Sequence, residues 1–172
     1  FGVHADDYED EVVVRSAQQL AEAMRLNTLP RYIGIRTKPF NSICVKRSTR
    51  TIDLFLATLL TASSGVLPTN FVITLPKVTN VSQVTALVQW LTIAEKRHNL
   101  APNSVLIELM VETTQSLFDA DGRSLIPQLL KAAKPRCRGV HFGTYDYTAS
   151  AGLSATEQRN DHPACDFARH LI

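Results

Sequence analysis

The sequence lacks the features that mark membrane-spanning and disulfide-stabilised proteins. None of its hydrophobic runs reaches the roughly 18 residues of a membrane-spanning helix, and only three of its 172 residues are cysteines. Cys44, Cys137 and Cys165 form no CxxC pair, which excludes the common zinc and redox motifs. A scattered, odd-numbered set is typical of reduced thiols, so we expect a cytoplasmic protein.

An excess of charge of one sign is also missing. The chain has 18 Lys and Arg residues against 16 Asp and Glu residues, a formal net charge of +2. Domains that bind nucleic acid or anionic membranes usually carry a clear basic excess, so we expect neither partner. Hydrophobic residues make up 45% of the chain, as in packed globular proteins. We expect one domain, residues 1–172. It is apparently truncated at both ends, because it begins without Met and stops inside a predicted helix.

Short apolar runs alternate with amphipathic segments along the chain. Most of the runs are almost continuously apolar, which is typical of parallel strands buried on both faces. A further strand is expected near Phe1–Ala5, and a last helix near the carboxyl end. Ser48 is the expected N-cap of one helix, and Asn80 and Gln83 have the spacing of a capping box. The predicted strands are 32–36, 71–75, 104–111 and 138–142, and the predicted helices are 13–26, 51–62, 81–98 and 125–133.

This alternation predicts an α/β fold with a parallel sheet and helices outside it. Two architectures fit: an open doubly wound sheet and a (β/α)8 TIM barrel. The sequence has neither GxGxxG nor GxxxxGK[ST], the phosphate-binding motifs that would favour an open sheet. A complete barrel needs about 200 residues or more, so the chain would hold only part of one, about five βα units. The pattern alone leaves the two architectures open.

Charged residues follow the predicted strands, at the carboxyl ends where parallel α/β proteins carry out their chemistry. Alternation along the predicted strand 32–36 places Arg36 on the face opposite Ile33 and Ile35. A guanidinium on that face can hold a carboxylate with two hydrogen bonds. A plain surface arginine is the alternative. The charged residues at the strand ends are Asp6, Asp7, Glu9, Asp10, Arg36, Lys38, Lys77, Glu112 and Asp146.

Two carboxylates, Glu112 and Asp146, are the candidate metal ligands. Glu108 and Glu112 share one face of an apolar strand, where acids are costly unless they are paired, protonated or bound to metal. Two carboxylates from neighbouring strand ends, completed by waters and substrate oxygens, are a common Mg²⁺ site. Solvated or helix-capping acids are the alternative. His141 lies on the strand before Asp146, either near the metal or as a hydrogen-bonded core residue.

Four motifs at these strand ends resemble the citrate lyase β-subunit-like family, which belongs with the HpcH/HpaI aldolases in the phosphoenolpyruvate/pyruvate superfamily. Their order and spacing match from near residue 5 to near residue 153. Longer segments, 50–56, 108–113 and 141–150, are similar to a poorly characterised bacterial branch of that superfamily. The four motifs are Ile35-Arg36-Thr37, Leu75-Pro76-Lys77-Val78, Val111-Glu112-Thr113 and Phe142-Gly143-Thr144-Tyr145-Asp146-Tyr147.

The resemblance implies a partial (β/α)8 barrel whose visible strands are the second to the sixth. It implies that Arg36 holds the substrate carboxylate, that Lys77 also binds substrate, and that Glu112 and Asp146 bind Mg²⁺. The barrel's second strand would be the one expected near Phe1–Ala5. The acidic motif that follows this strand in the family is matched by Asp7-Tyr8-Glu9-Asp10.

The implied reaction is that of a carbon–carbon lyase or aldolase acting on a keto acid or acyl-CoA through an enolate, with Mg²⁺ as the Lewis acid. The implied catalytic residues are Arg36 and His141. The general base is left open between His141, a metal-bound water and a residue outside this chain. The resemblance also implies a homo-oligomer. A phosphoenolpyruvate-binding phosphotransferase or mutase, and a non-catalytic barrel, are the alternatives.

Overall fold

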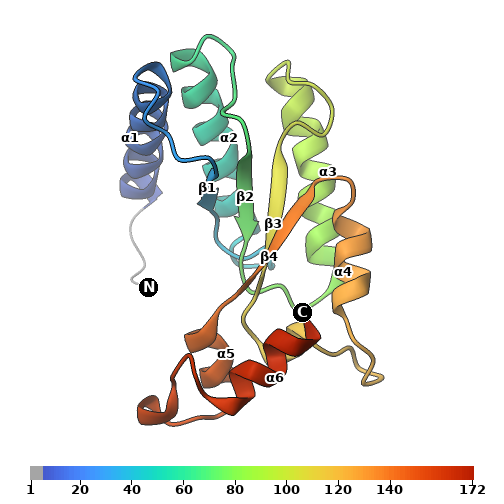
Figure 1. Ribbon diagram of the computed structural model, residues 1–172. Helices are drawn as coiled ribbons and strands as arrows, with labels where there is room; N and C mark the ends of the chain where they lie inside the picture. The colour runs from blue at the N-terminus through green and yellow to red at the C-terminus, as the bar shows by residue number, and fades with distance from the viewer. Residues whose placement is uncertain (1–5) are drawn as a thin grey trace.

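The apolar runs form a four-stranded parallel sheet in the computed structural model, which describes residues 6–172 (Figure 1). The strand expected near Phe1–Ala5 lies outside the described residues. Each predicted strand and helix is present to within a few residues, apart from two helices discussed below. The elements are α1 (Asp6–Arg25), β1 (Ile33–Arg36), α2 (Val45–Ala62), β2 (Phe71–Leu75), α3 (Val81–Arg97), β3 (Leu106–Val111), α4 (Ile126–Ala133), β4 (Cys137–Phe142), α5 (Thr144–Ser150) and α6 (Pro163–Leu171), with two 3-10 turns, Thr114–Ser116 and Ala155–Glu157.

The strands lie in the order β1-β2-β3-β4, so each strand pairs with the next one along the chain. Ile33 is paired with Phe71 at the start of β1, and Val72 is paired with Leu106 across β2 and β3. The β3–β4 ladder shifts register once, after Ile107. Because all pairs are parallel, the carboxyl ends of the four strands meet at one edge of the sheet, and α5 and α6 lie beyond that edge (Figure 1).

Helices α1 to α4 pack along one face of the sheet, and within residues 6–172 no helix covers the other face, called here the open face (Figure 1). In β3, Leu109 and Val111 are buried under the helices, whereas Glu108 and Met110 are partly exposed. The expectation that the strands are buried on both faces is therefore wrong for β1 and β3. A doubly wound sheet reverses its strand order and carries helices on both faces. Sequential order with helices on one face is the arrangement of a barrel wall, so the fold is part of a (β/α)8 barrel.

Helix α2 begins at Val45, six residues before the predicted start. The side-chain oxygen of Asn41 accepts the backbone amides of residues 43 and 44, which stabilises the chain just before the helix. Ser48 is therefore inside α2 and is not its N-cap; its hydroxyl donates to the carbonyl of Lys38 at 2.8 Å. The prediction of an N-cap at Ser48 is wrong because the sequence does not show whether a serine hydroxyl caps a helix or, as here, donates a hydrogen bond to a carbonyl elsewhere in the chain.

The capping box of α3 is confirmed, with Asn80 and Gln83 bonding reciprocally. Helix α1 starts at Asp6, seven residues before the predicted start. Its acidic first turns, which the sequence suggested were a strand-end cluster, interact favourably with the positive end of the helix dipole. Helix α5 occupies a segment for which the sequence pattern predicted no helix. Between residues 6 and 172 no helix combines the length and apolar character needed to cross a membrane.

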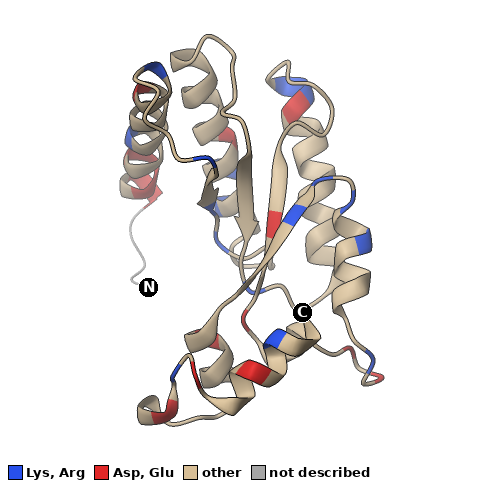
Figure 2. Ribbon diagram, viewed as in Figure 1, with Lys and Arg blue, Asp and Glu red and all other residues tan. Residues whose placement is uncertain are grey.

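Ion pairs fasten α1 to α2 and to the end of β1. Asp10 binds Arg47 at 2.5 Å and also binds Arg50, while Glu9 lies 2.7 Å from the ammonium of Lys38. The acidic start of α1 stands out in Figure 2, and elsewhere basic and acidic residues are interspersed. The hydrogen bond from Arg50, together with Arg47, lowers the pKa of Asp10 from 3.8 to about 2.

A buried ion pair ties the opposite, amino edge of the sheet together. Arg136 and Glu95 are 1% and 2% exposed, and the guanidinium contacts both carboxylate oxygens, at 2.5 and 2.8 Å. Glu95 also accepts the backbone amides of Asn103 and Val105. Bidentate pairing and two further donors compensate the desolvation of both charges. This pair links α3 to the segments that precede β3 and β4.

We expect Asp10→Asn to loosen α1 and to lower the free energy of unfolding by about 1 kcal/mol at neutral pH, a figure reduced for solvent screening. A carboxylate with a depressed pKa stabilises the fold above its unfolded value of 3.8, and this contribution is lost as pH falls towards 2. Urea unfolding of both proteins should therefore show a gap at neutral pH that narrows in acid. Asp161→Asn, in an exposed pair with Arg159, is the control and should change little. Equal stability of the Asp10 variant and the parent at neutral pH would contradict the assignment.

Candidate functional site

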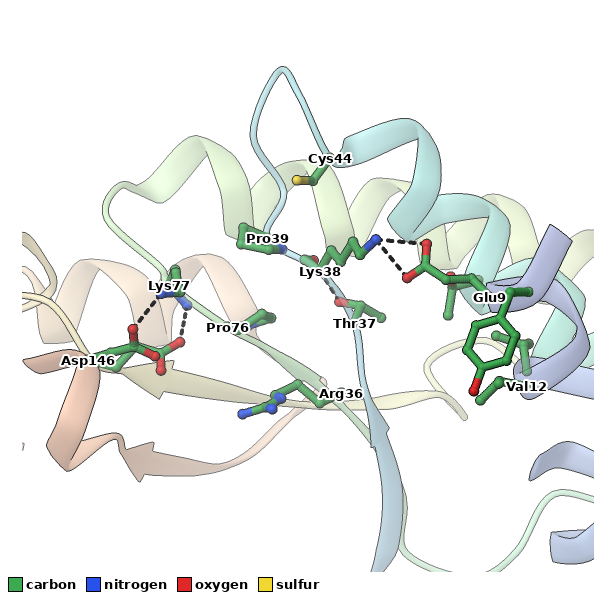
Figure 3. Close-up of a pocket in the computed structure, with 14 residues that line it drawn as sticks. Glu9, Val12, Arg36, Thr37, Lys38, Pro39, Cys44, Pro76, Lys77 and Asp146 are labelled. Carbon is green, nitrogen blue, oxygen red and sulfur yellow. Dashed lines mark hydrogen bonds and ion pairs between the residues drawn. The ribbon is translucent and has the colours of Figure 1, made fainter. Parts of the chain in front are cut away.

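A cavity of about 650 Å³ opens at the carboxyl edge of the sheet (Figure 3). Its wall is formed by α1, the end of β1, the β1–α2 loop and the segments that follow β2, β3 and β4. Four of the five predicted site residues line it: Arg36, Lys77, Glu112 and Asp146. Strand ends that are far apart in sequence thus converge on one cavity, as the parallel topology requires.

Glu112 directly follows β3 and is 2% exposed. Its carboxylate accepts the backbone amide of Lys77 at 2.8 Å. Burial raises the pKa of Glu112, and the neighbouring Asp146 adds to this, whereas the Lys77 amide opposes it. Glu112 is therefore the member of this acid pair that holds a proton more readily.

Asp146 lies in the first turn of α5, with its carboxylate 2.6 Å from the ammonium of Lys77 (Figure 3). That contact is the main cause of a lowered pKa for Asp146. The two carboxyl groups also influence each other, since Asp146 raises the pKa of Glu112 and Glu112 lowers that of Asp146. The site therefore holds two adjacent carboxyl groups whose pKa values are shifted in opposite directions.

Lys77 contacts both acids, one through its backbone and the other through its side chain. Its φ angle is +49°, in the left-handed region that side chains rarely adopt. This conformation, directly after Pro76, turns the amide towards Glu112 while the side chain reaches Asp146. The sequence indicated a substrate-binding role for Lys77 but gave no sign that it pairs with Asp146.

Gly143 provides the room in which Glu112 sits. A Cβ atom at this position would lie 2.6 Å from the Cβ of Glu112 and 2.9 Å from one of its carboxylate oxygens. This glycine lets the turn between β4 and α5 approach the Glu112 side chain, which places Asp146 beside that carboxylate.

Arg36 ends β1 on the open face of the sheet, as the alternation of the strand predicted. Its guanidinium points to the side of the cavity where Lys77 and Asp146 lie (Figure 3), and one of its nitrogens is 3.9 Å from the sulfur of Met110. Its positive charge contributes to the lowered pKa of Asp146. Arg36 therefore adds a second cation beside the acid pair.

His141 lies in a neighbouring cavity of about 420 Å³ on the open face of the sheet, which shares Arg36 with the first cavity. Its side chain is 47% exposed and pairs with Glu108, so the alternative of a core histidine is wrong. The pairing also explains how Glu108 is accommodated on this strand. His141 thus lies in the neighbouring cavity and is not among the residues that line the cavity of the acid pair.

The far wall of the larger cavity was not foreseen from the sequence. Tyr8 and Val12, one turn apart on α1, line it together with Glu9. Of the acidic motif 7–10, Glu9 reaches the cavity but is bound to Lys38 (Figure 3). Asp10 is bound to α2. The spacing of Tyr8 and Val12 would have revealed this wall only if α1 had been predicted to start early enough.

The acid pair fits a divalent cation. No group of three or more His, Cys, Asp and Glu side chains gathers at a metal-binding distance in the described part of the chain. Mg²⁺, however, commonly takes one or two protein carboxylates and fills its other positions with water and substrate oxygens. Glu112 and Asp146 supply such a pair at the wall of an open cavity.

The fold and the cavity define an α/β domain of barrel type with charged residues at the carboxyl ends of its strands. Over residues 1–172 the chain matches, and therefore belongs to, the family described as a domain of unknown function, DUF6986. A search of curated protein sequences finds no match.

Solved structures share the fold at low sequence identity. Malate synthase from Haloferax volcanii, as a lead(II) complex, superposes with a TM-score of 0.69 at 17% identity, covering 96% of this chain and 44% of that one. Its magnesium/glyoxylate complex gives a TM-score of 0.65 at 19% identity, covering 96% of this chain and 45% of that one. Its pyruvate/acetyl-CoA complex gives a TM-score of 0.65 at 18% identity, covering 96% of this chain and 42% of that one. A citrate lyase from Burkholderia xenovorans LB400 gives 0.64 at 20% identity, covering 92% of this chain and 46% of that one.

The chain therefore spans less than half the length of these structures. The partial barrel is confirmed, and the expected likeness to citrate lyase is confirmed as a likeness of fold. Membership of the HpcH/HpaI family stays a prediction.

We expect Gly143→Ala to force the β4–α5 turn away from Glu112 and to destabilise the protein by about 1–3 kcal/mol, the usual cost of overpacking. Gly139→Ala is the matched control, because the atoms nearest to its new Cβ atom all belong to the side chain of Glu108, the closest at 3.3 Å. Thermal unfolding of both variants compares the two costs. An equal or smaller loss in the Gly143 variant would show that this glycine is not needed for clearance.

Proposed function

We propose that this chain carries the metal- and carboxylate-binding part of the active site of an Mg²⁺-dependent carbon–carbon lyase or aldolase. The observation that carries the proposal is the convergence of two carboxylates, Glu112 and Asp146, and two cations, Arg36 and Lys77, on one cavity at the carboxyl edge of the sheet. Barrel enzymes build their active sites at this edge. The known ligands of the related fold, magnesium with glyoxylate and pyruvate with acetyl-CoA in the malate synthase, support a keto acid or acyl-CoA as the substrate class.

Each residue has a role that follows from its chemistry. Glu112 and Asp146 hold the ion, which when bound supplies a Lewis acid for a carbonyl oxygen. Arg36 binds a substrate carboxylate through its planar fork and orients it beside the acid pair. Lys77 adds positive charge on the same side of the cavity.

His141 is the candidate catalytic base contributed by this chain. Its pairing with Glu108 fixes the orientation of the imidazole ring. It lies one cavity away from the acid pair, and both cavities are lined by Arg36. A substrate long enough to pass Arg36 would bring its reacting carbon towards His141.

The metal assignment can be tested with three alanine variants. We expect Glu112→Ala and Asp146→Ala each to lose most of the Mg²⁺ affinity measured by calorimetric titration, because each removes one of two protein ligands. The control is Glu108→Ala, which removes the acid of β3 that pairs with His141 on the open face of the sheet. This variant should bind the ion like the parent. Loss of binding in the Glu108 variant alone would move the metal site to the open face of the sheet.

The role of Arg36 can be tested with Arg36→Lys, which keeps the charge but loses the two-pronged contact. We expect oxalate, a stable mimic of a keto-acid enolate, to bind on the order of tenfold more weakly, the effect of losing one hydrogen bond to a charged group. Mg²⁺ affinity should change little. Equal oxalate affinity in both proteins would place Arg36 outside the substrate site.

A reaction assay separates this function from the main alternative. A lyase releases or consumes a keto acid such as pyruvate, whereas a phosphoenolpyruvate-dependent phosphotransferase of the same superfamily releases or exchanges phosphate. Assaying both products with the same purified protein would decide between them. Phosphate exchange without pyruvate formation would overturn the lyase proposal.

A further inference from the structure

We propose that the ammonium of Lys77 is an internal counter-ion that occupies the cation position at the acid pair and has to leave when the metal enters. This inference deepens the proposed function and rests on the metal site assigned there. It gives Lys77 a role before substrate binding, as a competitor of the metal ion.

The first argument is the need for a positive charge. Gly143, in the turn that precedes Asp146, approaches Glu112 so closely that an added Cβ atom would lie 2.6 Å from the Cβ of Glu112, and both acids line the same cavity. Acidic side chains gathered in one site are stabilised by a cation beside them. The ammonium of Lys77 meets this need at 2.6 Å from Asp146. A divalent ion bound to the same carboxylate would stand close to that ammonium, and two like charges at such short range repel strongly.

The second argument is that the two contacts of Lys77 are separable. Its backbone amide holds Glu112, and only its side chain binds Asp146. The side chains of Lys77 and Asp146 are 42% and 40% exposed, so the ammonium can swing into solvent without disturbing the backbone. Glu112 therefore keeps its position when the ammonium leaves, and the metal ligands stay organised.

The third argument comes from the other lysine in the cavity. Lys38 lines the same cavity but binds Glu9, on the opposite wall from Asp146 (Figure 3). Both lysines carry the same charge and are about equally exposed, at 40% and 42%. They differ in which carboxylate they neutralise, so Lys38 is a matched control for the side chain of Lys77.

Calorimetric Mg²⁺ titration of Lys77→Met tests the inference. We expect the variant to bind Mg²⁺ about fivefold more tightly than the parent, the equivalent of one partly exposed ion pair that no longer has to be broken. Lys77→Gln should behave similarly, Lys77→Arg should retain the competition, and Lys38→Met should match the parent. A second readout needs no activity: the metal-free Lys77→Met protein should melt earlier than the parent and gain more from added Mg²⁺.

The outcomes separate this inference from the proposed function. If the parent and Lys77→Met bind Mg²⁺ equally well, Lys77 does not compete with the ion, and the metal site itself stands. If Lys77→Met binds more weakly, the lysine assists the metal and the inference is wrong. If neither protein binds Mg²⁺, the metal site and the inference both fail.

Discussion

The candidate site depends on the compensation of two neighbouring carboxyl groups by one residue. Lys77 donates its amide to Glu112 and its ammonium to Asp146, and so connects the ends of β2 and β3 to the start of α5. Without it, the buried Glu112 would lose a hydrogen bond and Asp146 would lose its nearest cation. The left-handed backbone of Lys77 makes both contacts possible at once, because it turns the chain sharply after Pro76.

The remainder of the fold brings these groups together and keeps them there. Four parallel strands in sequential order place their carboxyl ends at one edge, and the buried pair of Glu95 and Arg136 secures the opposite edge. Ion pairs between α1 and α2 hold the far wall of the cavity. The stable elements thus surround a cavity in which Glu112 is buried, whereas Glu9, Lys38, Lys77 and Asp146 remain partly exposed.

The two faces of the sheet divide the charged residues into two groups. Glu108 and His141 pair on the open face, within the smaller cavity, whereas Glu112 and Asp146 pair at the edge, within the larger one. Arg36 lines both cavities and connects them. This arrangement separates the groups proposed to bind metal from the histidine proposed to move a proton, and it places Arg36, proposed to bind the substrate carboxylate, between them.

The sequence by itself determined the alternation of helices and strands along the chain from α1 to β4, the capping box of α3 and the placement of Arg36, Lys77, Glu112 and Asp146 at or just after strand ends. These follow from local periodicity and from the rule that parallel strands share a carboxyl edge. Only the tertiary structure decided that Lys77 pairs with Asp146, 69 residues away, and that Gly143 makes room for Glu112. It also decided that Ser48 is buried inside α2 and that Asp10 fastens α1 to α2. Such contacts join residues that are distant in sequence, and a pattern of residue types does not state which distant partner a side chain will meet.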